Sequence, residues 1–222
     1  MSEVWDRIQD LAQHIEQQFA ESGLQINHAD TDYDWHSRVY SSRHYRRAHV
    51  HTVDRRDSHK ILILHATVFP HYNDPSPIWG FDAVCGPNKI TGAFHDFSNG
   101  GDPDHAMMQW FAGKSQQYQW QRPRQLPEWA QAIFSENMIA AGNVSAGPEL
   151  DSICDLAQDS LAYYLDHVGH SQQDVADYHM IQNRYCHYQK QNPHVVNSMV
   201  TMGTTENKIR RYMNEIQYPE IY

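Results

Sequence analysis

The chain has 222 residues, 40% of them hydrophobic and 20% charged, and its formal net charge is −10 with 16 histidines counted as neutral. This composition predicts a globular protein whose residues 1–222 form one domain. An acidic chain is poorly suited to bind nucleic acid, and no run of about 20 apolar residues is present that would span a bilayer.

The cysteines and the N-terminus indicate the compartment. Three cysteines are scattered without a CxxC pair, and the first residues lack the basic and apolar segments of a signal peptide. Both features predict a protein of the reducing cytoplasm. The sequence also has no GxGxxG or GxxxxGK[ST] loop, so it indicates neither a dinucleotide-binding crossover nor a phosphate cradle. Nothing in it indicates a bound flavin or an iron–sulfur cluster.

Helical patterns occupy both ends of the chain. Apolar residues recur at helical spacing from Trp5 to Phe19, behind Ser2 as a suitable N-cap, and Gly23 ends the run. A polar connection over 24–36 follows. Five further helices are predicted, around 107–111, 127–135, 150–168, 173–191 and 209–216.

Strand patterns occupy the stretch from Arg38 to Ser98. Apolar runs such as ILILHATVF and PIWGFDAVC alternate with clusters of Pro, Gly, Asn and Asp, which predicts about five antiparallel strands. Because side chains alternate along a strand, His49 and His51 share one face, and His65 shares a face with Thr67. Helices, then strands, then helices predict an α/β fold in which helices cover an antiparallel sheet.

Asp82 and His65 are the strongest candidates for chemistry. Asp82 stands between Phe81 and Ala83 in an apolar strand. One interpretation is a carboxylate bound to backbone amides; the other is an acid whose pKa is raised by burial and lowered by a nearby charged histidine. The second would deliver protons near neutral pH. His65 is likewise either a core histidine or the partner of Asp82 on a neighbouring strand.

Several motifs of this chain resemble those of the ferredoxin-dependent bilin reductases and follow the same order along the sequence. They are the spacing of His65 and Asp82, FP at 69–70, PIWGFD at 77–82, GP at 86–87, YRRAHVH at 45–51, LPEWAQAIFS at 126–135 and NRYCHYQKQN at 183–192. Within the family the chain most resembles phycocyanobilin:ferredoxin oxidoreductase and the phage-type phycoerythrobilin synthases. Together the matches extend over most of the chain.

The resemblance implies a fold and an activity. The fold would be a three-layer α/β/α sandwich with a tetrapyrrole pocket between the sheet and the C-terminal helices. The activity would be reduction of biliverdin IXα by sequential single-electron and proton transfers in a monomer in the cytoplasm of a bacterium or a phage-infected cell. Reduced ferredoxin would be the external electron donor. No cofactor would be bound permanently, so the substrate would hold the radical while the protein supplies protons.

The resemblance also assigns roles to residues. Asp82 would be the central proton donor and His65 its partner, while His49 would join their water network. His51 stands where phycocyanobilin-forming relatives carry the glutamate that protonates the D-ring vinyl group.

The remaining family positions concern the ends of the substrate. Thr91 falls at a serine that contacts a propionate, and Asn192 at the asparagine of an Asn-Asp pair whose aspartate is here Pro193. The propionate-binding arginine expected after Phe134-Ser135 is missing. The absence of a carboxylate at position 51 favours four-electron reduction to phycoerythrobilin through 15,16-dihydrobiliverdin. Pro193 weakens this choice, because it removes the second aspartate that the phage-type enzymes can use on the A-ring. Arrest at that intermediate and reduction to phycocyanobilin are the alternatives.

Other interpretations remain open at this stage. His49 and His51 on one strand face resemble part of a metal site in a metal-dependent enzyme, although no third ligand has a convincing spacing. A tetrapyrrole-binding module without turnover is a further alternative. Metal analysis, and colour changes with biliverdin and reduced ferredoxin, distinguish these interpretations. Basic residues are expected to dock an acidic ferredoxin; they are Arg43, Arg46, Arg47, Arg55, Arg56 and Lys60, with Lys208, Arg210 and Arg211 as a second cluster.

Overall fold

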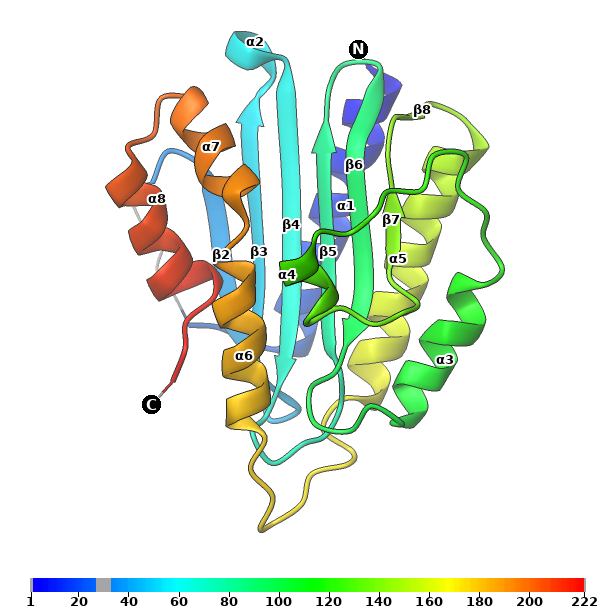
Figure 1. The fold of residues 1–222 in the computed structure, drawn as a ribbon, viewed down its shortest axis with the longest axis vertical. Coiled ribbons are helices and arrows are strands. Elements are labelled where there is room, and N and C mark those ends of the chain that lie inside the picture. The colour runs from blue at the N-terminus through cyan, green and yellow to red at the C-terminus, as the bar shows by residue number, and fades with distance from the viewer. Residues whose placement is uncertain (1, 27–32, 222) are drawn as a thin grey trace.

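The computed structural model describes residues 2–26 and 33–221, and it shows an antiparallel sheet between two layers of helices (Figure 1). The strands lie in the order β1-β2-β3-β4-β5-β6-β7, and β8 pairs with β6. Their bounds are β1 Leu24–Gln25, β2 His36–Ser41, β3 Tyr45–Arg55, β4 Ile61–Pro70, β5 Ile78–Cys85, β6 Lys89–Ser98, β7 Ile139–Ala141 and β8 Val144–Ser145. The predicted α/β/α sandwich with a central antiparallel sheet is confirmed.

The five predicted strands correspond to β2 through β6, each paired with the next in sequence. The sequence analysis missed β1, β7 and β8, which have only two or three residues each. Such short segments carry no alternation to detect. Part of the predicted connection over 24–36 lies outside the described residues.

Three helices pack on one face of the sheet. They are α1 Glu3–Ser22, α3 Ala106–Ser115 and α5 Pro148–His167. The Ser2 side chain accepts a hydrogen bond from the Trp5 amide and Gly23 ends α1, both as predicted. Alternate residues of β4, from Leu62 to Val68, join these helices in the main hydrophobic core. Burial of this apolar surface is the main stabilising term of the fold.

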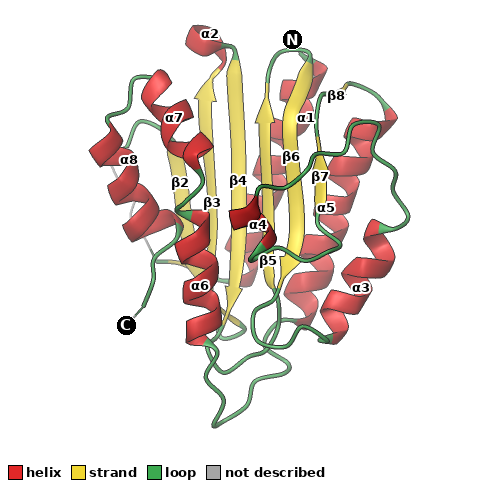
Figure 2. Ribbon diagram, viewed as in Figure 1, coloured by secondary structure: helices red, strands yellow, loops and turns green. Residues whose placement is uncertain are grey.

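The C-terminal helices and α4 cover the opposite face (Figure 2). The elements are α4 Glu128–Gln131, α6 His179–Gln189, α7 Pro193–Thr201 and α8 Glu206–Tyr212, which continues as the π-helical turn Met213–Gln217; α2 Arg56–His59 closes the β3–β4 hairpin. None of the described helices is both long and apolar enough to cross a membrane.

Two helix predictions on this face were wrong in extent. The helix predicted over 173–191 begins only at His179, and the one predicted over 127–135 is the single turn α4. Pro193 does stop α6, but it also opens α7, because the Oδ1 atom of the Asn192 side chain accepts a hydrogen bond from the His194 amide at 3.0 Å and caps the new helix. Proline is compatible with the first helical turn, where no backbone donor is needed.

Candidate functional site

A cavity of about 580 Å³ lies between the sheet and the C-terminal helices. This volume is within the range of about 300–1,000 Å³ that small-molecule sites occupy. Its walls carry large apolar and aromatic side chains, including Trp129, Phe134 and Met199, and a small set of polar groups from β3, β4 and β5. The alternation of the strands explains this division: residues of β4 at even positions enter the core, and those at odd positions face the cavity side.

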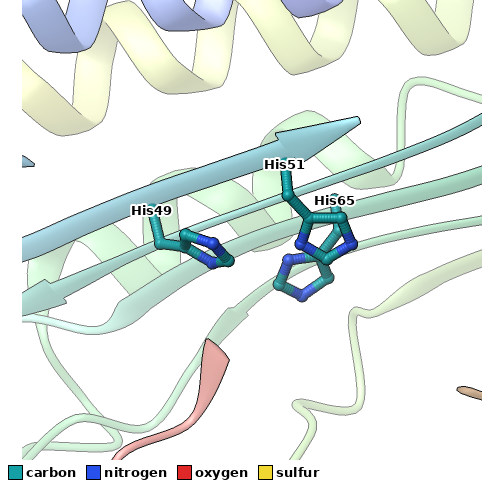
Figure 3. Close-up of side chains that lie close together, drawn as sticks. All are labelled: His49, His51 and His65. Atoms are coloured by element: carbon teal, nitrogen blue, oxygen red, sulfur yellow. The ribbon is translucent and has the colours of Figure 1, made fainter. Parts of the chain in front are cut away.

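Three histidines project from the cavity face of the sheet (Figure 3). His51 stands opposite His65 in the β3–β4 ladder, and His49 stands opposite Thr67. The rings of His51 and His65 are stacked with their centroids 5.0 Å apart. All three side chains are buried. Burial lowers the pKa of each, that of His65 to about 3, so these imidazoles are neutral at physiological pH.

Asp82 lies beside this cluster on β5, opposite His65 in the ladder. Its side chain borders the cavity, and burial raises its pKa to about 7. The expectation that a charged histidine would lower this pKa is wrong, because the neighbouring His65 is itself kept neutral by burial. Asp82 is therefore a carboxyl group that exchanges a proton near neutral pH.

The expected direct hydrogen bond between His65 and Asp82 is also absent within the described part of the chain. The Nε2 atom of His65 instead shares a hydrogen bond of 2.7 Å with the hydroxyl of Tyr218. Tyr218 is buried and borders the same cavity. Its pKa is raised well above its ordinary value by burial, so the hydroxyl keeps its proton and is able to donate it to the ring nitrogen of a neutral His65.

A second tyrosine and a serine hold His49. Its Nε2 atom lies 3.1 Å from the Ser37 hydroxyl and 3.2 Å from the Tyr212 hydroxyl. The Tyr212 hydroxyl donates in turn to Ser37 at 3.0 Å. Sequence reasoning missed these partners, because Tyr212 falls within the helix predicted over 209–216 and no motif marks Ser37 or Tyr218. The contacts join positions up to 175 residues apart, a separation that no local pattern reports.

The Nδ1 atoms of His49, His51 and His65 have no hydrogen-bond partner among the described residues, although all three are buried. A buried polar atom without a partner costs about 1–3 kcal/mol, so a bound ligand or water would stabilise this cluster. One ligand atom from each histidine lies within 4.8 Å of one from each of the others. His65 thus supplies the third ligand that a metal site lacked in the sequence analysis, and neutral imidazoles suit zinc or copper.

The other predicted substrate-binding residues lie near the cavity in different ways. Thr91 borders it, but its hydroxyl donates to the Val84 carbonyl oxygen at 2.9 Å. Asn192 borders it while its side-chain oxygen caps α7. His49 is not among the described residues that border the cavity; it lies beside His51 with their ring centroids 5.3 Å apart. The structure therefore brings Asp82, His65, His51, Thr91 and Asn192 to one cavity.

The structure divides the predicted basic docking cluster. Arg46 donates to the Gln182 side chain at 2.6 Å, and Arg47 donates to the Ile216 carbonyl oxygen, so both guanidinium groups serve the protein interior. Arg55 forms an ion pair with Asp34 at 2.5 Å, and Arg56 forms one with Asp54 at 2.6 Å. Paired arginines present little net positive charge to a partner. Docking of ferredoxin by this cluster stays a prediction. The contacts above make it less favourable, because they use the charges and donors of four of the arginines.

The replacement Asp82→Asn should change how stability depends on pH. The pKa of Asp82 is raised to about 7, so its contribution to stability is complete below the unfolded-state value near 4 and is lost as the pH rises through 7. Asparagine has no ionisable side chain, so the variant does not lose stability in this way as the pH rises. The free energy of unfolding of Asp82→Asn, relative to wild type, should therefore rise between pH 4 and pH 8 by at most about 4 kcal/mol. Urea unfolding measures it, with exposed Asp57→Asn as control; a pH-independent difference would contradict the assignment.

The replacement Tyr218→Phe should destabilise the fold by about 1–3 kcal/mol, because it leaves the buried Nε2 atom of His65 without a partner. Tyr72→Phe is a matched control, since the Tyr72 hydroxyl is buried without a partner among the described residues. Urea unfolding at pH 7 should show a loss for the first variant and almost none for the second. Equal effects would mean that the Tyr218 hydrogen bond does not support His65.

Comparisons with known proteins identify the family. Residues 2–219 match the family model described as ferredoxin-dependent bilin reductase. The solved structure of the protein named PcyX is 22% identical, with a TM-score of 0.70, and the alignment covers 97% of this chain and 99% of that chain. Phytochromobilin synthase from tomato, solved in complex with biliverdin, is 13% identical, with a TM-score of 0.72 and coverage of 92% and 81%. No curated protein sequence matches.

The two structural likenesses show the fold, and the match of the family model extends over nearly the whole chain. The chain belongs to the ferredoxin-dependent bilin reductase family.

Proposed function

We propose that this protein reduces biliverdin IXα, with reduced ferredoxin as its source of electrons and Asp82 as its central proton donor. The observation that carries the proposal is the carboxyl group of Asp82, whose pKa is raised to about 7 in the wall of a cavity of suitable size. The family and the biliverdin complex of a structural neighbour support the choice of substrate.

The protein's part in this chemistry is to orient the substrate and to supply protons. Reduction of one carbon–carbon double bond takes two electrons and two protons. Ferredoxin supplies the electrons one at a time, so the tetrapyrrole itself carries the unpaired electron between steps. Asp82 is protonated in a large fraction of molecules at neutral pH and can give its proton to the reduced substrate. His65, held by Tyr218, then lies beside the carboxylate that remains.

The histidine at position 51 bears on which bond is reduced. Burial lowers the pKa of His51 well below its ordinary value, so it carries no extra proton at neutral pH and is a poor acid. Protonation of the D-ring vinyl group then lacks a donor. We therefore propose four-electron reduction through 15,16-dihydrobiliverdin to phycoerythrobilin, with Thr91, Asn192 and the histidines at 49 and 51 in contact with the substrate or its water network.

Pro193 limits this choice of product. A proline side chain has no proton to give, so reduction of the A-ring must use Asp82, His65 or water. Arrest at 15,16-dihydrobiliverdin is the main alternative product, and phycocyanobilin would require His51 to act in place of a carboxyl group.

A metal-dependent activity is the second candidate, favoured by the ligand atoms of His49, His51 and His65 within 4.8 Å of one another. It leaves Asp82 and the large apolar walls of the cavity without a role. Elemental analysis of the purified protein separates the two candidates.

The test is an anaerobic assay with biliverdin and reduced ferredoxin, followed by chromatography of the product. Wild type should convert biliverdin only when reduced ferredoxin is present, and phycoerythrobilin should be the main product. Asp82→Asn should still bind biliverdin as a coloured complex, but turn over about 10²–10⁴-fold more slowly, because the proton donor is lost.

Two outcomes would contradict the proposal at different levels. Wild-type rates in Asp82→Asn would remove Asp82 from the proton-donating role. Phycocyanobilin as the main product would show that the neutral His51 still supports reduction of the vinyl group. Only the proposal of phycoerythrobilin as the product would then be wrong.

A further inference from the structure

Arg124 stands at the edge of the cavity, and it is the only lysine or arginine among the described residues that border it. The backbone around it is fixed to the sheet. Its amide donates to the Ala140 carbonyl oxygen at 2.8 Å, and the Gly142 amide donates to the Arg122 carbonyl oxygen at 2.9 Å. The position of Arg124 is therefore set by β7 and not by a free loop.

Two glycines make room for its side chain. A Cβ atom on Gly92 would stand 2.9 Å from an Nη atom of Arg124, and a Cβ atom on Gly142 would stand 2.9 Å from its Nε atom. Both distances are too short for ordinary contact. The guanidinium group also lies over the Phe94 ring, 5.8 Å from its centroid. The missing side chains on β6 and after β7 thus leave a place beside the cavity that the guanidinium group occupies.

No carboxylate pairs with Arg124 within the described part of the chain. Other arginines are paired, such as Arg7 with Asp151 at 2.9 Å and Arg210 with Glu206 at 2.7 Å. The Arg124 side chain is exposed, so its planar set of donors is available to a ligand. A guanidinium group binds a carboxylate through two parallel hydrogen bonds, which fixes orientation as well as charge.

The polar groups on β5 and β6 that border the cavity are less suited to an anion. Thr91 borders the cavity next to Gly92, but its hydroxyl proton is already donated to the Val84 carbonyl oxygen. Asp82 and Asp96 both border the cavity as well, and a carboxylate of the ligand would be repelled by each in its charged form. Anionic groups of a ligand are therefore expected to pair with Arg124 and not to approach Asp82.

We propose that Arg124 binds a propionate carboxylate of the bilin, and so places the conjugated centre of the molecule over Asp82. This inference rests on the proposed function, since it takes a bilin as the ligand. Arg124 thereby fills the role for which the sequence offered no arginine after Phe134-Ser135.

The test compares two ligands, biliverdin and its dimethyl ester, in absorbance titrations without reductant. Arg124→Gln should weaken binding of biliverdin about ten-fold, the loss expected for a charge-assisted hydrogen-bonded pair, and should leave binding of the ester unchanged. Arg124→Lys should fall between wild type and Arg124→Gln, because it keeps the charge without the paired donors. Arg122→Gln is the matched control: Arg122 is exposed and does not border the cavity.

The outcomes separate this inference from the proposed function. Unchanged affinity of Arg124→Gln for biliverdin, or an equal loss for biliverdin and its ester, would overturn the role of Arg124 alone. Failure of wild type to bind either ligand would overturn the proposed function itself. If Arg124→Gln does not fold by circular dichroism, Arg124→Lys carries the comparison, and its equal affinity for biliverdin relative to wild type would count against the inference.

Discussion

The site depends on one physical constraint, the burial of ionisable groups without charged partners. Asp82, His51 and His65 stand on the cavity face of neighbouring strands, and burial is the main cause that shifts the pKa of the aspartate up and those of the histidines down. Each shift favours the uncharged form. The result is a neutral pocket that contains an acid ready to release a proton near pH 7, which is what proton-coupled reduction of a large conjugated ligand requires.

The rest of the fold makes this arrangement possible. The face of β4 opposite the cavity packs into the main core with α1 and α5, and this packing stabilises a sheet whose cavity face is energetically unfavourable. The C-terminal segment then supplies Tyr212 and Tyr218, whose hydroxyls hold His49 and His65. Polar residues are thus held by long-range contacts, while the positions of their strands follow from local hydrophobic patterning.

The sequence predicts the parts of this structure that rest on local patterns. The strand alternation places His65 and Asp82 on the cavity face, and the capping residue Ser2 defines the start of α1. The partners of the histidines could not be predicted, because Tyr218 reaches His65 from 153 residues away through a tail with no motif. Arg124 was missed for a similar reason, since its place depends on Gly92 and Gly142 from other segments. The neutral state of His65 could not be predicted either, because it follows from the burial of the side chain, which the sequence alone does not show.

Direct titration of Asp82 tests the account most closely. The protein can be labelled with ¹³C at the aspartate carboxyl carbons, and the Asp82 signal, assigned by its loss in Asp82→Asn, can be followed by NMR from pH 3 to pH 9 without ligand. The account predicts a midpoint near pH 7, as burial of the carboxyl group implies. A midpoint near pH 4, the value of an aspartate in water, would show that water or a charged partner solvates Asp82 and would contradict its role as the central acid.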